Sequence, residues 1–355
     1  GMLHAFRLDT GEELWAFIPP MLNAKLKDMV SSEPNKSMSI FGVDATPVVK
    51  DVFVDGRWKT IVMGGLGMGG HGYYALDVTD PDSPEHLFSF AYDPDTKEGN
   101  TWSGRNGAKS TTNNFDNLGE GWSKPHILRI PIGGISRWVA VIGGGFNGGN
   151  IREYGSVVYV LDLEDSGSVI RKIDVTDLSG NKIFNSVPTS LTAITPDSSD
   201  KANYTGAMVY FADLEGKLWK LNLTNQGVFN SIKQVFDVEA DNLNGRLSYH
   251  SVTPAMGGDN KLRMYYGTGD QQKLMSGSLQ IDNRFLGIKE ERFPSEDTIT
   301  SFKESESDKN ILVDVTDTPE YSDESDKSWK IKLKPGEFLK GHHHLKVSLY
   351  LIFFH

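Results

Sequence analysis

Short apolar segments recur along the chain, separated by turns rich in glycine, asparagine and aspartate. The segments are four to eight residues long and rich in Val, Ile, Tyr and Trp, which favours β-strands. They group into four units of four segments each, which begin at Thr46, Ser123, Ser186 and Ser251. A proline near the start of each unit recurs at intervals of 78, 63 and 66 residues (Pro47, Pro125, Pro188 and Pro254). Four-stranded units repeated along one chain are typical of β-propeller blades.

The flanks of the four units predict further, incomplete blades. The opening segment Gly1–Ile18 reads as the last half of a preceding blade, a hairpin with its turn at Asp9–Glu13. Ile311–Asp317 and Ser328–Glu337 read as parts of one more, which makes about six blades. Only Pro19–Ser32 approaches a helical period. We therefore predict an all-β fold, a β-propeller of four-stranded antiparallel blades of the modified seven-bladed, quinoprotein-like type, truncated here.

Two long insertions and the chain ends complete the predicted organisation. Asp93–Gly121 and the acidic Ser295–Asn310 are expected to be solvated surface loops, with partner recognition at the propeller rim as the alternative. We expect residues 1–340 to form the propeller domain, which starts within a blade. Residues 341–355 read as an aberrant or truncated tail, with a buried final strand or a metal site at His342–His344 as alternatives. The apolar run in this tail is too short to span a bilayer.

Composition narrows the classes of function. The 36 Lys and Arg against 47 Asp and Glu leave a net charge of -11, which disfavours nucleic acid as a partner. The chain has no cysteine, which excludes disulfides, thiolate zinc sites and cysteine nucleophiles but leaves the compartment open. No signal peptide is visible at the start, and the chain begins inside an expected strand, so we expect a piece of a longer protein.

A glycine motif behind Ile61–Met63 resembles a dinucleotide fingerprint. Gly65, Gly67 and Gly70 fall in a G-x-G-x-x-G frame, but a strand-like "YYALDV" follows them where a nucleotide site needs a helix. The same frame recurs at Gly143, again before a strand-like segment. A feature repeated in several blades belongs to the architecture, so we interpret these glycines as positions of close backbone approach and positive φ. His71, among them, is expected to make a structural hydrogen bond.

Calcium is the metal that the sequence makes worth testing. The loop Thr195–Gly206 offers oxygen ligands, although Lys201 stands where a further ligand would be expected; the candidate ligands are Asp197, Ser199, Asp200 and Asn203. A second loop, Asp237–Gly245, offers carboxylates and an amide at Asp237, Glu239, Asp241 and Asn244. An ordinary polar turn is the alternative at both places. No H-E-x-x-H or G-x-S-x-G motif is present, and the sequence supports no catalytic site.

The wording of several segments resembles one family. Six segments resemble, in the same order along the chain, segments of the C-terminal propeller of the PilY/PilC family of type IV pilus proteins. They are "GMLHAFRLDTGEELWAFIP", "WKTIVMGGLGMGGHGYYALDVTDP", "LGEGWSKPHI", "RWVAVIGGGFN", "VYFADLEGKLWKLNL" and "RMYYGTG". The resemblance implies an exported protein at the pilus tip, cell surface or outer membrane. It also implies a calcium loop at Thr195–Gly206, where this sequence retains only Asp197 and Asp200 as acids.

The resemblance leads to our functional hypothesis. We expect a non-catalytic domain that acts in pilus assembly, retraction control (and so twitching motility) and surface attachment. Its expected partners are minor pilins or the pilus tip complex, and a host or abiotic surface. The main alternative is a propeller dehydrogenase that uses pyrroloquinoline quinone, because "TGEELW" also resembles the blades of quinoproteins. A structural propeller with another exported partner is the third possibility.

Overall fold

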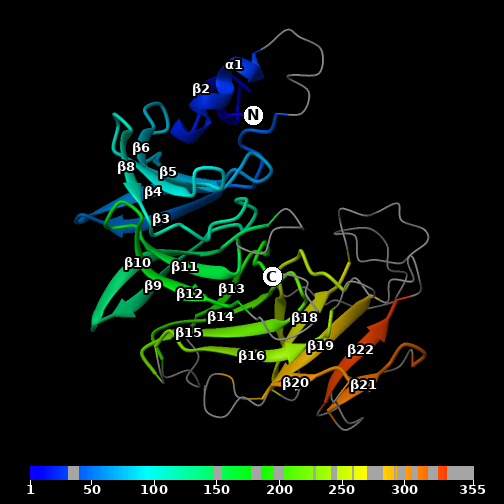
Figure 1. Ribbon diagram of the computed structural model, residues 1–355. Helices are drawn as coiled ribbons and strands as arrows, with labels where there is room; N and C mark the ends of the chain where they lie inside the picture. The colour runs from blue at the N-terminus through cyan, green and yellow to red at the C-terminus, as the bar shows by residue number, and fades with distance from the viewer. Residues whose placement is uncertain are drawn as a thin grey trace.

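The fold is a succession of antiparallel β-sheets that follow one another in chain order, as a computed structural model shows (Figure 1). The structure describes residues 1–30, 40–147, 154–176, 185–195, 204–226, 229–240, 246–257, 260–269, 283–291, 293, 301–305, 311–318 and 327–333. Within them lie a two-stranded hairpin and four larger sheets, which we call blades 1 to 4. The predicted all-β propeller class is confirmed.

Blades 1 and 2 contain the first two predicted units. Blade 1 is built from β3 (Val48–Val54), β4 (Arg57–Gly65), β5 (Gly72–Asp77), β6 (Glu85–Asp93), β7 (Glu98–Ser103) and β8 (Ala108–Thr112), paired in that order. Blade 2 is built from β9 (His126–Ile132), β10 (Ile135–Gly143), β11 (Val157–Asp162) and β12 (Ser168–Asp174). Every neighbouring pair in the two blades is antiparallel, as expected for strands joined by short turns.

Blades 3 and 4 each add a strand in parallel to an antiparallel set. Blade 3 is built from β13 (Thr192–Ile194), β14 (Gly206–Ala212), β15 (Leu218–Thr224), β16 (Ile232–Asp237) and β20 (Phe302–Lys303), the last parallel to β16. Blade 4 is built from β17 (Thr253–Met256), β18 (Leu262–Gly267), β19 (Arg284–Glu290), β22 (Ser328–Lys332) and β21 (Leu312–Asp314), the last parallel to β22.

The N-terminal hairpin packs against one face of blade 1. Its strands β1 (Leu3–Phe6) and β2 (Glu13–Phe17) lead into two short helical turns, η1 (Pro20–Lys25) and α1 (Leu26–Met29). These turns lie in Pro19–Ser32, the segment whose pattern approaches a helical period. Leu22 of η1 is buried with Tyr74 and Leu76 of blade 1. The hairpin therefore covers one face of blade 1, as two strands of a preceding blade are expected to do.

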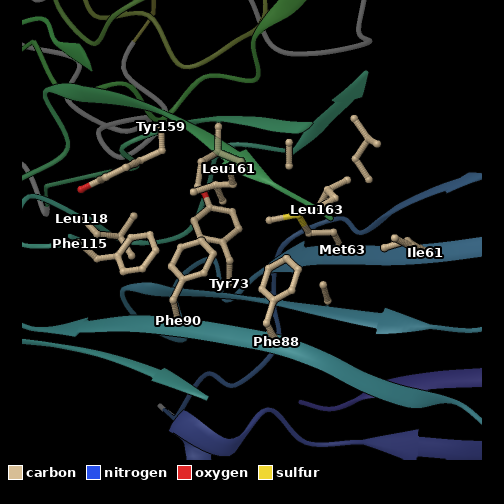
Figure 2. Close-up of a cluster of buried hydrophobic side chains, with 14 of the residues drawn as sticks. Ile61, Met63, Tyr73, Phe88, Phe90, Phe115, Leu118, Tyr159, Leu161 and Leu163 are labelled. Carbon is tan, nitrogen blue, oxygen red and sulfur yellow. The ribbon is translucent and has the colours of Figure 1, made fainter. Parts of the chain in front are cut away.

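The central strands of blades 1 and 2 are buried on both faces, which explains why they are mostly apolar. β5 and β11 are fully buried, and successive side chains point to opposite faces. Tyr73 faces blade 2, and Tyr74 faces the N-terminal hairpin. Figure 2 shows the core between blades 1 and 2, in which Phe90 stacks on Phe115 at a ring distance of 4.1 Å. Similar apolar cores join blades 2 and 3 and blades 3 and 4.

Two parts of the predicted strand assignment are wrong. Asp93–Gly121, expected to be a surface loop, contains β7 and β8, which extend blade 1 outward. Ile311–Asp317 and Ser328–Glu337 are predicted to be parts of a further blade, but β22 pairs with β19 and β21 pairs with β22, so both strands complete blade 4. Local pattern thus missed two polar strands in the first case, and in the second it predicted strands but not the sheet edge to which they add. The expected strand Gly277–Ile281 and the tail 341–355 lie outside the described residues.

One pair of equivalent positions tests the importance of inter-blade packing. Ile127 of β9 and Val49 of β3 occupy equivalent positions, because each pairs with the residue three positions before the end of the adjacent strand, β10 or β4. Ile127 is 5% exposed, whereas Val49 is 61% exposed. We expect Ile127→Val to lower the free energy of unfolding by about 1 kcal/mol, because it removes a buried methylene. Val49→Ala removes more atoms but should change stability by less than about 0.5 kcal/mol. Urea unfolding followed by tryptophan fluorescence measures both, and equal losses would contradict this assignment of the core.

Candidate functional site

The glycine motif forms the turn between β4 and β5. Gly67 and Gly70 have φ angles of 59° and 138°, which favour glycine over residues with a Cβ. A strand follows the turn, as predicted, so the motif lacks the helix N-terminus that holds a pyrophosphate in dinucleotide-binding folds. The equivalent turn of blade 2 contains Gly145, with a φ of 92°. The interpretation of these glycines as architectural is confirmed.

These turns take part in a repeated pattern of backbone hydrogen bonds that we call the turn ring. In each case, the segment that enters a blade bonds to the turn after the second strand of its own blade and to the same turn of the preceding blade. Residues 119–121 bond to Gly67, Gly70, Gly144 and Phe146; residues 186–187 bond to Gly145 and Leu214; residues 247–248 bond to Leu214 and Gly269. The turn ring thus joins the four blades through backbone hydrogen bonds at one end of their strands.

Close approach of backbones in the turn ring explains the need for glycine. A Cβ placed on Gly65 would overlap the carbonyl oxygen of Gly121, and one on Gly145 would overlap that of Glu120. The Gly67 N–H donates to Gly121 O at 3.0 Å, and the Gly145 N–H donates to Val187 O at 3.0 Å. A side chain at Gly65 or Gly145 would therefore push adjacent segments apart and break these hydrogen bonds.

Several polar and aromatic side chains support the turn ring from the side. His71 Nδ1 lies 2.9 Å from Leu118 O, which confirms the expected structural hydrogen bond. Burial lowers the pKa of His71, so the neutral imidazole donates this bond. Trp122 donates through Nε1 to Glu120 Oε2 at 2.9 Å, and burial raises the pKa of the Glu120 carboxyl. The Trp122 ring packs on Phe146 with a centroid distance of 4.5 Å.

A surface cleft of ≈ 460 Å³ opens beside the turn ring. It is lined by Asp44, Ala45 and Thr46 before β3, by Gly67 and Met68 of the β4–β5 turn, by Trp122 and Lys124 before β9, and by Ser190 before β13. Three blades contribute to this lining, so only the assembled fold creates the cleft. No local sequence pattern predicts this cleft, although "LGEGWSKPHI", one of the segments that resemble the PilY/PilC family, contains Trp122 and Lys124.

A second polar cluster joins blades 3 and 4 through Glu304, which directly follows β20. Its side chain is 7% exposed and accepts from Arg246 at 2.8 Å, Arg284 at 3.0 Å and Lys330 at 2.6 Å. Burial opposes ionisation of Glu304, but the Lys330 hydrogen bond and the two arginines outweigh it and lower the pKa of the carboxyl. The sequence indicated only an acidic loop here, because the three cations come from distant segments.

Of the predicted calcium ligands, only Asp237 and Glu239 lie among the described residues. Asp197, Ser199, Asp200 and Asn203 lie outside the described residues, as do Asp241 and Asn244 of the second loop. In that loop, Asp237 Oδ1 accepts from the Glu239 N–H at 2.7 Å, and the Glu239 carboxylate accepts from the N–H and hydroxyl of Ser305. Among the described residues, no three His, Asp or Glu side chains are grouped closely enough to hold a metal ion.

Comparison with known proteins identifies the propeller. The family model described as the PilY1 beta-propeller domain matches residues 1–273. The chain belongs to the PilY1 β-propeller family. Its similarity to the crystal structure of the Pseudomonas aeruginosa PilY1 C-terminal domain supports the same fold, with a TM-score of 0.62 and 22% identity over 96% of this chain and 70% of that chain. The expected resemblance to PilY/PilC proteins is thereby confirmed.

Curated PilY1 relatives agree with this assignment. The chain is 34% identical over 223 residues to the type IV pilus biogenesis factor PilY1 of Pseudomonas aeruginosa strain UCBPP-PA14, which covers 63% of this chain and 16% of that protein. It is 31% identical over 244 residues to a PilY1 homologue of Xylella fastidiosa, which covers 64% of this chain and 14% of that protein. The chain thus spans about one sixth of the length of these relatives. Within its described residues, no helix combines the length and apolar character that crossing a bilayer requires.

Proposed function

We propose that this PilY1-type propeller serves type IV pilus biogenesis as a non-catalytic domain at the cell surface. The match of the PilY1 propeller model over residues 1–273 is the observation that carries this proposal. The domain contributes to pilus assembly, retraction control and surface attachment through contacts with minor pilins or the tip complex. It remains peripheral to the outer membrane, where its partners in the pilus act.

The geometry supports binding rather than catalysis. The distinctive glycine segments are engaged in backbone bonds of the turn ring, and Glu304 is surrounded by three cations that hold two blades together. The Nδ1–H of His71 donates to Leu118 O, so this histidine has a structural role in supporting the turn ring. Surface loops and clefts on this rigid scaffold are the features suited to partner recognition.

Deletion of the gene in its native bacterium tests the pilus role. We expect fewer surface pili and reduced twitching, both restored by the full-length gene. Electron microscopy and a twitching assay measure these outcomes. Unchanged piliation and motility in the deletion strain would overturn the proposal and favour a different exported partner.

The quinoprotein alternative predicts a different result. A dehydrogenase reconstituted with calcium and pyrroloquinoline quinone should show cofactor absorbance and dye-linked alcohol oxidation. The PilY1 family match favours the binding role, for which we expect no turnover. Measurable alcohol oxidation would overturn the non-catalytic assignment.

We further propose weak calcium binding by the loop Thr195–Gly206. Asp197 and Asp200 carboxylates with the Ser199 hydroxyl and Asn203 amide form an all-oxygen donor set, which suits calcium, while the charge of Lys201 weakens it. Calorimetric titration is expected to give a Kd on the order of 1 mM, as in weak extracellular calcium modules. The Asp197→Ala, Asp200→Ala variant should lose this heat. Identical heats from the two proteins would dismiss the loop as a calcium site.

A further inference from the structure

Two large apolar residues, Met68 and Trp122, line the cleft beside the turn ring. Met68 is 51% exposed at the tip of the β4–β5 turn and belongs to none of the four buried clusters of described residues. Trp122 lines the same cleft from the segment that enters blade 2. Methionine and tryptophan are enriched where proteins bind other proteins, because one adapts its shape and the other offers a large rigid surface.

Trp122 is fixed before any ligand arrives. Its indole N–H donates to the Glu120 carboxylate. The centroid of its ring lies 4.5 Å from that of Phe146 and 6.2 Å from that of Tyr249. The side chain therefore presents carbon surface to the cleft and has no hydrogen-bond donor left to offer. A preorganised aromatic side chain loses little conformational entropy on binding, which is a property of interface hot spots.

The rim of the cleft bears one charge of each sign. Asp44 and Lys124 are both exposed, and neither forms an ion pair in the part of the chain that the structure describes. Their backbones are held in place, since Asp44 N–H donates to Leu66 O at 3.2 Å and Lys124 N–H donates to Ser190 Oγ at 3.2 Å. The carboxylate and ammonium thus remain available to groups of opposite charge on a ligand.

From these observations we propose that the cleft is a docking site for an extended peptide segment, which inserts one large apolar side chain between Met68 and Trp122. The segment carries a basic residue on the side of Asp44 and an acidic residue on the side of Lys124. The volume of ≈ 460 Å³ lies within the range of roughly 300–1,000 Å³ found for ligand pockets. This inference rests on the proposed role in protein contacts and specifies one surface for it.

Nuclear magnetic resonance of the whole chain, labelled at methionine methyls and tryptophan indoles, tests the proposal with defined probes. Titration with N-acetyl-phenylalaninamide is expected to shift the Met68 methyl and Trp122 indole signals saturably, with a Kd on the order of 1 mM. N-acetyl-glycinamide, which lacks the apolar side chain, should cause no saturable shift. Two outcomes would overturn the proposal: saturable shifts of these signals with D-glucose but not with N-acetyl-phenylalaninamide, or no saturable shift with either compound.

Matched variants separate the cleft from general surface effects. Met68→Gln keeps the length of the side chain and should weaken binding of N-acetyl-phenylalaninamide at least tenfold. Met256→Gln is the control, because Met256 is 55% exposed on β17 and does not line the cleft; its binding should equal that of the unmodified protein. Unchanged binding by Met68→Gln would reject the site.

Charged probes test the rim. Acetyl-Lys-Phe-Glu-amide and acetyl-Glu-Phe-Lys-amide should differ in affinity severalfold, and 0.5 M salt should remove the difference because it screens exposed charges. Asp44→Asn should lower the affinity of the better peptide alone. Equal affinity of both peptides would contradict the role given to the rim. These measurements use the isolated chain and test only the cleft. A negative result would therefore reject the docking site without deciding the proposed pilus role, which the piliation assay tests separately.

Discussion

Gly145→Ala is expected to lower the free energy of unfolding by about 3–5 kcal/mol. The φ of 92° at this residue costs an L-residue about 1–2 kcal/mol. The added Cβ would also overlap the carbonyl oxygen of Glu120, so the turn must move away from residues 119–121. That movement weakens hydrogen bonds such as Gly145 N–H to Val187 O, each of which contributes about 1 kcal/mol. Urea denaturation followed by tryptophan fluorescence measures the loss.

Gly134→Ala is the matched control for this prediction. Gly134 has a φ of 82° in the turn between β9 and β10, and no atom lies within 4 Å of an added Cβ. The substitution should cost only the conformational part, about 1–2 kcal/mol. If the two variants lost equal stability, steric contact in the turn ring would not be the reason for glycine at position 145.

Glu304→Gln is expected to cost about 3–5 kcal/mol at neutral pH, because it leaves three buried or half-buried cations without their shared carboxylate. Arg284 is 3% exposed and Lys330 is 15% exposed, so water compensates little for the loss. Glu291→Gln is the control. Glu291 is 67% exposed and lies 3.6 Å from Lys289, and its replacement should change stability by less than about 0.5 kcal/mol.

The same glutamate gives a pH dependence with a definite sign. Burial alone would raise its pKa, but the Lys330 hydrogen bond and the two arginines lower the folded-state pKa below the ordinary value of 4.5. The stabilisation is therefore complete above pH 4.5 and is lost as pH falls through the lower folded-state pKa. The difference in stability between the unmodified protein and Glu304→Gln should narrow below about pH 4. A difference that stayed constant down to pH 2 would show that the carboxylate charge is not the cause.

Much of the fold could be predicted from local pattern. The strands of blades 1 and 2 follow runs such as Gly72–Asp77, in which consecutive apolar residues indicate a strand buried on both faces. The glycine frames were correctly separated from a nucleotide site because the residues after them have strand character. These inferences succeed because backbone conformation and burial on two faces leave their mark within a few neighbouring residues.

One error arose where distant segments pair. β22 completes blade 4 only because β19 presents a free edge to it, and no residue in Ser328–Lys332 identifies that partner. The other error concerns neighbouring strands: the polar composition of β8 suggested a loop, since its side chains are mostly exposed at the outer edge of blade 1. Hydrogen-bonding edges are properties of the assembled sheet, and they leave little signal in the strand that joins them.

The sequence by itself determined the strand repeat, the blade class and the family, because each is encoded in short segments whose order is fixed along the chain. Only the tertiary structure decided how the cleft and the Glu304 cluster are made. Met68, Trp122 and Ser190 come from three blades, and Arg246, Arg284 and Lys330 meet Glu304 from separate segments. Such sites depend on distances between residues far apart in the chain, and those distances exist only after the blades have packed together.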